Sequence, residues 1–325
     1  MSQRIVVGID IGHSEVKVSS HAGQFSFPSF ACPAVRITDE TEAKRAAAET
    51  VMVGEKEWFI GETAIIQSSG ILTSGLTDEW IETPEHSALL AGAFKKLAQR
   101  GINLSGAMIV LGLPSRLHQR QKARLRELAR ELVNAEFKVL PQPIGPYYAY
   151  MLDAKGAPIA DRPITQMSWA VVDVGYYTTD FLLMMKGRWV ESVKDSAKGV
   201  HVAAQNLQRI LRDRDIDTDL AECERAIQTK TVRHFGTQNV SEEVQKATSL
   251  VVSEVADASQ RLLNQLAGKL DGILVAGGGA YLIADTLKSK WRTAILADNP
   301  RYSVCEGFRR FGLGLMLAKG QAVAA

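Results

Sequence analysis

Short apolar runs alternate with longer amphipathic stretches along this chain. Apolar runs rich in β-branched residues predict strands, and apolar residues spaced three or four positions apart predict helices. The predicted strands are 5–9, 16–20, 108–113, 137–140, 169–174, 181–185, 190–193 and 273–275. The predicted helices are 85–99, 119–134, 144–152, 200–213, 241–268 and 280–290, with a last helix after Cys305. Helices that alternate with strands indicate an α/β fold.

Two kinds of segment interrupt this alternation. The stretch 155–165 contains Pro158 and Pro163 and predicts an exposed loop between two halves of the chain. The polar stretch 33–83 has no clear period and predicts a small lobe over the first half, and 228–240 predicts a similar lobe over the second. A length of 325 residues agrees with about two domains.

One short pattern occurs twice. Residues 6–17 are VVGIDIGHSEVK and residues 169–180 are WAVVDVGYYTTD. Each is an apolar strand ending in Asp-x-Gly, followed by a tight turn with hydroxyl side chains and then a second strand. A third segment, residues 272–280, is GILVAGGGA, an apolar strand that runs into three glycines. Together these segments predict two related halves that bind a nucleotide between them.

The chemistry of the Asp-x-Gly hairpins suits a polyphosphate and its metal ion. Glycine permits a sharp turn and lets an anion approach the backbone amides. The carboxylates of Asp10 and Asp173 repel phosphate, but they can hold a hydrated Mg²⁺, which prefers oxygen ligands and keeps several waters. The glycine triplet before a predicted helix leaves room for a ribose or a purine.

These segments resemble the motifs of the actin/Hsp70/sugar-kinase ATPase superfamily. Residues 10–17 match its first phosphate motif, 173–180 its second, and 275–280 its adenosine motif. Residues 140–148, LPQPIGPYY, are similar to the first interdomain connector, and 304–308, VCEGF, to the second. All five segments follow the order of the superfamily and span nearly the whole chain. The resemblance implies an α/β fold of two related actin-like (ribonuclease H-like) domains with a nucleotide cleft between them.

Within the superfamily, the chain most resembles the plasmid-segregation bacterial actins of the ParM/StbA type and their archaeal relatives. The features that carry this likeness are Gly112-Leu113-Pro114 after a strand, the basic helix 119–133, and residues 275–283. The resemblance implies a cytoplasmic ATPase that assembles into filaments with ATP and disassembles after hydrolysis. It also implies ATP and Mg²⁺ as cofactors, with GTP left open, and a DNA-binding adaptor of a plasmid partition system as a partner.

The resemblance also divides the chain into domains. Domain I is expected at 1–155, with its small lobe at about 30–85, and domain II at 165–304, with its small lobe at about 213–250. The helix at about 305–320 is expected to pack back on domain I.

The resemblance further assigns a set of candidate site residues. The catalytic candidates are Asp10, Gln142, Asp173 and Asp180, and Asp10 and Asp173 would hold the metal through its waters. Gln142 is expected to orient the attacking water, and Lys17 to add positive charge. The candidates for binding the nucleotide are Gly12, His13, Ser14, Lys17, Gly175, Tyr176, Tyr177, Thr178, Gly199, Gly277, Gly278, Gly279 and Ala280.

Four positions depart from the pattern of the superfamily. Many relatives carry a small hydroxyl or amide residue where this chain has His13 and Glu15, and a glutamate near a triphosphate is favourable only if it points away. Tyr176 and Tyr177 are bulkier than the glycine and threonine that are usual there.

Composition and charge narrow the function further. A formal net charge of +2 is too small to argue for direct binding of nucleic acid. The basic stretch 116–130 predicts a solvated helix face, with a contact surface for an acidic partner or a neighbouring subunit as the alternative. No apolar run approaches the roughly 20 residues that span a membrane. The three scattered cysteines favour a reducing cytoplasm, and a strand directly after Arg4 argues against a signal peptide.

Two alternative functions remain within the superfamily. A small-molecule kinase needs an acceptor pocket with a general base, and no sugar-binding signature is evident. A regulatory or chaperone-like ATPase needs cluster-ligating cysteines or a further peptide-binding domain, and neither is evident. The chain lacks the Gly-x-x-x-x-Gly-Lys-Ser/Thr and Gly-x-Gly-x-x-Gly motifs of Walker-type ATPases and dinucleotide enzymes.

Overall fold

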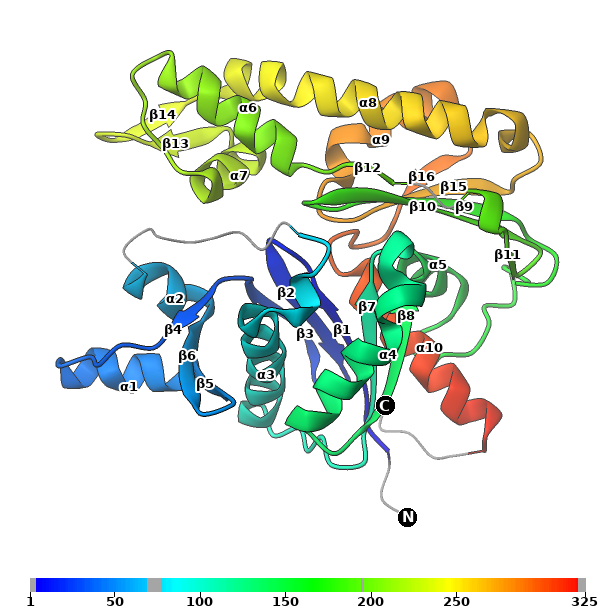
Figure 1. Ribbon diagram of the computed structural model, residues 1–325. Coiled ribbons are helices and arrows are strands. Elements are labelled where there is room, and N and C mark those ends of the chain that lie inside the picture. Colours follow the sequence, from blue (N-terminus) through cyan, green and yellow to red (C-terminus); the bar gives the residue numbers. More distant parts are fainter. Residues whose placement is uncertain (1–3, 69–76, 194–195, 321–325) are drawn as a thin grey trace. The chain divides into compact units, whose positions relative to one another are not determined.

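The computed structural model describes residues 4–68, 77–193 and 196–320 (Figure 1). The chain divides into two compact units. The first unit contains the described residues up to Arg162 and those from Tyr302 onward, and the second runs from Pro163 to Arg301. The loop predicted at 155–165 contains the first of these division points, and the second lies just before the last helix.

The first unit is built on a five-stranded mixed sheet. Strands β1 (Val6–Ile11), β2 (Glu15–Ser20) and β3 (Gly23–Pro28) form an antiparallel meander, and β7 (Met108–Leu113) and β8 (Glu136–Pro141) continue the sheet parallel to β1. The strand order is β3-β2-β1-β7-β8. All six residues of β1 are buried, as expected for a central strand covered on both faces.

Helices cover both faces of this sheet. Helices α3 (Pro84–Gln99) and α4 (Ser115–Leu132) share a hydrophobic core with one face. Helices α5 (Ile144–Met151) and α10 (Ser303–Ala318) pack together over the other face. Gly8 of β1 allows α10 to lie directly on the sheet, because a Cβ atom at this position would lie 2.0 Å from the carbonyl oxygen of Cys305 on α10.

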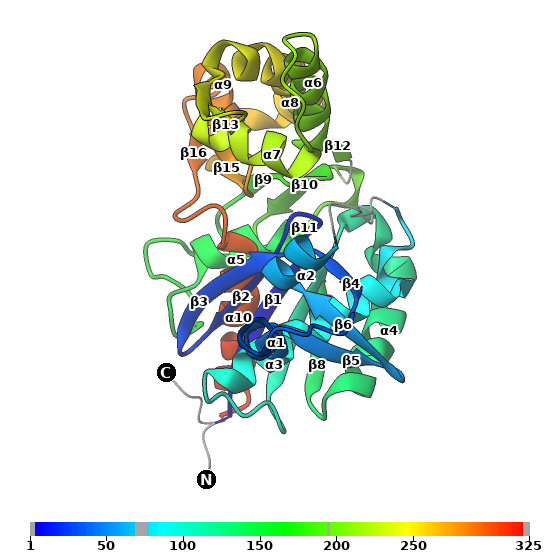
Figure 2. The same ribbon diagram turned by 90° about the vertical axis from the view of Figure 1, so that its left-hand side faces the viewer.

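A small lobe is attached to the first unit (Figure 2). It consists of a three-stranded antiparallel sheet, ordered β4-β6-β5, and two helices. Its elements are β4 (Ala31–Pro33), α1 (Glu40–Ala48), β5 (Thr50–Val53), β6 (Lys56–Ile60) and α2 (Gly61–Gln67). Sequence analysis placed a small lobe at 33–83 without assigning its elements, and the structure shows that much of this stretch forms regular strands and helices. The hydrophobic pattern did not reveal these elements, because the strands are short and α1 buries only Ala46.

The second unit repeats the plan of the first. Strands β9 (Trp169–Val174), β10 (Thr178–Met185) and β11 (Arg188–Trp189) are antiparallel neighbours, and β15 (Gly272–Ala276) and β16 (Ala294–Leu296) run parallel to β9. Their order is β11-β10-β9-β15-β16, and β12 (Ser196–Lys198) pairs with β10. In both units, therefore, the first strand of the hairpin has its antiparallel partner on one side and two parallel strands on the other.

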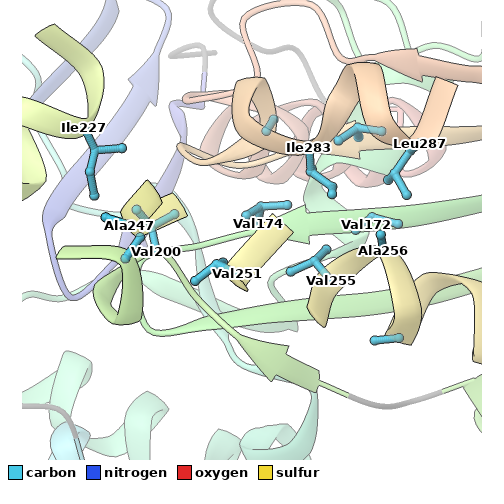
Figure 3. Packing of buried hydrophobic residues seen from close by; sticks show 14 of the residues in the cluster. Val172, Val174, Val200, Ile227, Ala247, Val251, Val255, Ala256, Ile283 and Leu287 are labelled. Carbon is cyan, nitrogen blue, oxygen red and sulfur yellow. The ribbon is translucent and has the colours of Figure 1, made fainter. Parts of the chain in front are cut away.

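The hydrophobic core of the second unit is formed largely by three long helices, α6 (His201–Arg212), α8 (Ser241–Ala267) and α9 (Ala280–Lys290). The short helix that follows α6 adds Cys223, Ala226 and Ile227 to this core. Figure 3 shows part of this core, which contains Val172, Val174, Val200, Ile227, Ala247, Val251, Val255, Ala256, Ile283 and Leu287. A second set of small elements follows α6, namely α7 (Leu220–Thr229), β13 (Thr231–Arg233) and β14 (Thr237–Asn239).

The long elements agree with the predicted ones, and the differences have local causes. The predicted strand at 190–193 is wrong: residues Glu191–Val193 form a 3-10 turn, and the strand before it, β11, has only two residues. Helix α4 begins at Ser115, four positions before the predicted start, because Pro114 occupies its N-cap position and fixes the backbone there.

Within the described part of the chain, every helix falls short of the length and apolar character needed to cross a bilayer.

Glu306 anchors α10 to the sheet of the first unit. Its buried carboxylate accepts hydrogen bonds from the Ser19 hydroxyl of β2 (2.6 Å) and from the guanidinium groups of Arg309 (3.1 Å) and Arg310 (2.7 Å). Burial by itself would raise the pKa of Glu306, but the hydrogen bonds from Arg309 and Ser19 outweigh it and lower the pKa to about 2. The ionised carboxylate therefore stabilises the folded unit.

We expect Glu306→Gln to lower the free energy of unfolding at neutral pH. Because the folded-state pKa of about 2 lies below the ordinary 4.5, this stabilisation is complete above pH 4.5 and is lost as the pH falls towards 2. Its size is at most about 3 kcal/mol. Denaturant titrations at pH 7 and pH 3 should show a smaller loss of stability with acid in the variant than in the wild type.

The matched control is Glu55→Gln, which changes an exposed glutamate in the turn between β5 and β6. This control should keep the stability and the pH dependence of the wild type. If Glu306→Gln also kept both, Glu306 would not anchor α10.

Candidate functional site

The first hairpin places a buried carboxylate beside a lysine. Asp10 near the end of β1 lies directly opposite Lys17 of β2 in the antiparallel register, so both side chains leave the same face of the sheet. The Lys17 Nζ atom is 3.7 Å from Asp10 Oδ2, and the two side chains are 14% and 7% exposed. This ion pair offsets the cost of burying the Asp10 charge.

Gln142 completes this cluster from a distant part of the chain. It follows β8, where its backbone amide donates to the carbonyl oxygen of Leu113 on β7 (2.8 Å). Its side-chain Nε2 donates to Asp10 Oδ1 (2.8 Å). The structure thus brings together three predicted residues, Asp10, Lys17 and Gln142, although 132 positions separate Gln142 from Asp10.

The turn after Asp10 is fixed by backbone hydrogen bonds. The Gly12 amide donates to the Glu15 carbonyl oxygen (3.0 Å), which closes the hairpin. Ser29, which directly follows β3, supports the turn. Its hydroxyl donates to the Gly12 carbonyl oxygen (2.6 Å), and its amide donates to the Ser14 carbonyl oxygen (2.9 Å). The expectation that the Gly12 amide binds phosphate needs correction, because that amide serves the hairpin. His13 and Ser14, the other predicted phosphate-binding residues of this turn, follow Gly12 directly.

The two unusual residues of this turn have partners inside the first unit. The His13 ring stacks on Trp80, with ring centroids 4.1 Å apart and an angle of 22° between the planes. The Glu15 carboxylate accepts a hydrogen bond from the Ser26 hydroxyl of β3 (3.4 Å). Sequence reasoning did not assign a site role to Ser29 or to Trp80. Their only signal is position, since Ser29 directly follows β3 and Trp80 sits among acidic residues.

The second hairpin places two carboxylates opposite each other. Asp173 of β9 pairs with Asp180 of β10 in the antiparallel register, and both are buried, at 8% and 3% exposure. The Thr178 hydroxyl donates to Asp180 Oδ2 (2.7 Å). Two neighbouring buried carboxylates favour a cation or a proton between them.

The turn between β9 and β10 packs against the start of α6. The Gly175 amide closes the hairpin by donating to the Thr178 carbonyl oxygen (2.9 Å), so this amide, like that of Gly12, is not a candidate phosphate donor. The amide of Val200 donates to the Gly175 carbonyl oxygen (3.1 Å) and that of His201 to the Tyr176 carbonyl oxygen (2.8 Å). Residues at the start of α6 therefore fix this turn from outside the hairpin.

Gly199 and the two tyrosines belong to the same contact. A Cβ atom at Gly199 would lie 2.3 Å from the Tyr176 carbonyl oxygen, so this position requires a glycine. The rings of Tyr176 and Tyr177 both pack against the ring of His201, a residue that sequence reasoning did not single out. Burial raises the pKa of Tyr176, which keeps its hydroxyl protonated.

The glycine triplet lies against the second hairpin. The Gly279 amide donates to the Val174 carbonyl oxygen (2.9 Å), and a Cβ atom at Gly277 would lie 2.6 Å from Asp173 Oδ1. Gly278 has open space at its Cβ position. The Ala280 side chain is fully buried in the hydrophobic core, so only the backbone of this candidate can face a ligand.

Each unit places one buried carboxylate, Asp10 or Asp173, where it could hold a hydrated Mg²⁺. No group of three or more His, Cys, Asp and Glu side chains within the described ranges could hold a metal ion by itself. A Mg²⁺ ion that keeps its waters needs only one or two carboxylates besides phosphate oxygens. Asp173 lies opposite a second carboxylate, whereas Asp10 already lies beside the Lys17 ammonium group.

Comparison with known proteins matches both halves of the chain to actin-related families. Residues 8–145 match the N-terminal domain of actin-like proteins, and residues 171–289 match the C-terminal domain of MreB-like archaeal actin homologues. No curated protein matches this chain.

Several solved structures share the fold. A 15-stranded ParM filament from Clostridium botulinum is 19% identical, with a TM-score of 0.77 over 96% of this chain and 99% of that chain. The archaeal actin homologue Ta0583 is 19% identical, with a TM-score of 0.72 over 97% and 99%. A MamK double helical filament is 23% identical, with a TM-score of 0.68 over 97% and 99%. These likenesses confirm the predicted fold class of two α/β domains of the actin type.

The glycine triplet allows a sharp test with neighbouring residues. Gly277→Ala should destabilise the second unit by about 2–4 kcal/mol, because Gly277 has a φ of +88° and its new Cβ would meet Asp173 and the backbone of Val174. Gly278→Ala adds the same methyl group in open space and should leave stability within about 0.5 kcal/mol of the wild type. Thermal and denaturant unfolding measure both; equal stability of the two variants would contradict this packing of the triplet.

Proposed function

The chain belongs to the actin-like proteins, and from this premise we propose that it is a Mg²⁺-dependent ATPase whose bound nucleotide controls its assembly into filaments. The observation that carries the proposal is the repeat of one arrangement in both units. Each unit has a hairpin with a buried aspartate just before its tight turn, on a sheet that continues with two parallel strands. Such turns offer backbone amides to phosphate oxygens, and the carboxylates suit the accompanying cation.

The residues of the site divide the work of phosphate binding and water activation. The amides of His13 and Ser14 in one turn, and of Tyr176 and Tyr177 in the other, bind the β- and γ-phosphates. Lys17 adds positive charge, which it shares with Asp10 at 3.7 Å. The ribose or the purine can lie close to the backbone at Gly277, Gly278 and Gly279, because these residues carry no side chains. Hydrolysis of a phosphoanhydride depends mostly on such positioning and charge neutralisation.

We assign to Gln142 the role of orienting the water that attacks the γ-phosphate. Its Nε2 is held by Asp10, which orients the side-chain amide and directs its oxygen away from that carboxylate. An amide held in this way can accept a hydrogen bond from water and align it for attack on the γ-phosphate. Bound Mg²⁺ supplies charge neutralisation for the phosphate oxygens, and Asp173 would hold it through its waters, with Asp10 and Asp180 as further candidates.

The nucleotide would act as a timer of assembly. ATP-bound subunits associate, and hydrolysis favours their release, because the contacts to the γ-phosphate end when it is cleaved. The likeness to ParM and MamK filaments supports self-association. We further propose that the filament moves plasmid DNA in the cytoplasm, and that a separate DNA-binding adaptor connects the two.

Hydrolysis can be tested at Asp173. We expect the wild type to hydrolyse ATP only with Mg²⁺, and Asp173→Asn to reduce turnover by a factor on the order of 100 or more while the fold survives. Gln142→Ala should slow turnover more than it weakens binding. Release of inorganic phosphate measures both. The control is Asp285→Asn, at an exposed position of α9 in the same unit. Unchanged turnover in Asp173→Asn would remove Asp173 from the site.

Assembly can be followed by right-angle light scattering. With Mg²⁺ and ATP, scattering should rise above a critical protein concentration and decay as ATP is consumed, whereas ADP should give no lasting signal. Negative-stain microscopy of the same samples should show filaments. Failure to assemble over a wide range of protein, salt and nucleotide concentrations would instead favour a kinase or a regulatory ATPase, and an acceptor that stimulates turnover would identify the kinase.

We expect the purified protein to bind DNA weakly by itself. The net charge is only +2, and the arginines of α4 at positions 116, 120 and 124 are paired with acidic side chains of the same unit. Binding through phosphate contacts needs several clustered cations and weakens steeply with salt. A gel-shift experiment at about 150 mM salt, with and without ATP, tests this; tight and sequence-selective binding without an adaptor would contradict it.

A further inference from the structure

An acidic segment, residues 78–82, lies along α4 in the first unit. Three arginines spaced four positions apart on one face of α4 pair with it: Arg116 with Asp78, Arg120 with Glu79 (2.9 Å) and Arg124 with Glu82 (3.0 Å). In addition, the Gln121 side chain donates to the Asp78 carbonyl oxygen (2.6 Å). The acidic partner of the basic helix is therefore part of the same unit.

The acidic segment carries Trp80 in its 3-10 turn, Trp80–Glu82. Trp80 is 7% exposed, and its ring lies between two histidines. The His13 ring stacks on it at 4.1 Å, and the His86 ring meets it edge-on at 5.1 Å with an angle of 84° between the planes. Trp80 therefore connects the acidic segment directly to the turn that follows Asp10.

The surroundings of Trp80 leave it little freedom. The Thr83 hydroxyl donates to the Trp80 carbonyl oxygen (2.7 Å) and accepts from the His86 amide (3.2 Å), which caps α3. His86 is buried, and burial together with the nearby His13 lowers its pKa to about 3. His86 is therefore neutral at pH 7 and serves as a fixed support behind the indole.

We propose that Trp80 is a positioning residue for the phosphate-binding turn Gly12–Ser14, and that the ion pairs between the acidic segment and α4 hold it against His13. The inference rests on the proposed nucleotide binding at this turn. His13 is both a member of the turn and the stacking partner of Trp80, so a ligand that orders the turn also orders the indole and the segment that carries it. Coupling of this kind is reciprocal: loosening the segment weakens nucleotide binding by the factor by which nucleotide tightens the segment.

The size of the effect follows from the kind of contact. An aromatic stack contributes enough to change an equilibrium by about two- to tenfold. Each exposed ion pair contributes less by itself, and their number on one short segment makes the set effective. We therefore expect loss of the stack to raise the dissociation constant for nucleotide up to about tenfold, with no change in the chemistry of hydrolysis.

The first experiment uses tryptophan fluorescence together with isothermal titration calorimetry. Adding Mg²⁺ and ADP to the wild type should change the indole emission, and both Trp80→Phe and His13→Gln should abolish most of that change. Trp58→Phe, a buried tryptophan of β6 in the same unit, is the control and should retain it. In calorimetry, Trp80→Ala should bind ADP up to about tenfold more weakly, and Trp80→Phe should restore most of the affinity.

The second experiment tests the ion pairs by hydrogen exchange. ADP should slow amide exchange in peptides covering residues 77–86 of the wild type. The triple variant Arg116→Gln, Arg120→Gln, Arg124→Gln should exchange faster there and lose the effect of ADP. Lys122→Gln is the control, because Lys122 is a half-buried residue of the same helix that donates to Gln119. It should behave as the wild type.

The outcomes separate the two proposals. If calorimetry detects no binding of ADP or ATP to the wild type, the proposed nucleotide site fails. If the wild type binds nucleotide, but Trp80→Phe keeps the emission change and the triple variant keeps the protection by ADP, the nucleotide site stands and the role of Trp80 is overturned.

Discussion

A carboxylate that leaves water must find donors or a cation, and this requirement organises much of the molecule. Asp10 meets it with Lys17 and Gln142, which ties β1 to its hairpin partner and to the end of β8. Glu306 meets it with Ser19 and two arginines, which ties α10 to β2. In each case the charged group lies where segments distant in sequence meet, so satisfying the charge also fixes the position of an element.

Close backbone contacts impose a second constraint. Helices α5 and α10 approach each other at Gly145 and Gly307, where a Cβ atom at Gly307 would lie 1.7 Å from the Gly145 carbonyl oxygen. Gly8 lets α10 lie directly on β1. Only glycine permits contacts of this kind, and they bring Glu306 within reach of β2. These close contacts hold the last helix in the first unit, which is where the resemblance to the superfamily placed it.

The first unit also shows how an apparently exposed charged surface can be used internally. The basic face of α4 predicts a solvated surface or a contact with an acidic partner, and the structure supplies acidic side chains from residues 78–82. The three arginines are 36%, 58% and 45% exposed, so water still reaches them. The solvated helix face is thus confirmed, and the acidic side chains that pair with it come from the same unit; a contact with a separate partner or a neighbouring subunit stays a prediction. The pairing matters because the same short segment places Trp80 against His13.

The sequence alone was sufficient for the features that depend on local pattern. The apolar runs and the repeated Asp-x-Gly predict the central strands and the two hairpins, and the five ordered motifs predict the family and the fold class. Asp10, Gln142 and Asp173 were named as candidates from these motifs, and their roles remain proposals.

Features that depend on contacts between distant segments could not be predicted in this way. The small lobe lacks a clear period because its strands are short and half-exposed. The support of the turns by Ser29 and His201, and of His13 by Trp80, arises only when separate elements pack together. Local periodicity records which face of an element is buried, whereas the tertiary structure alone decides which side chain lies against it.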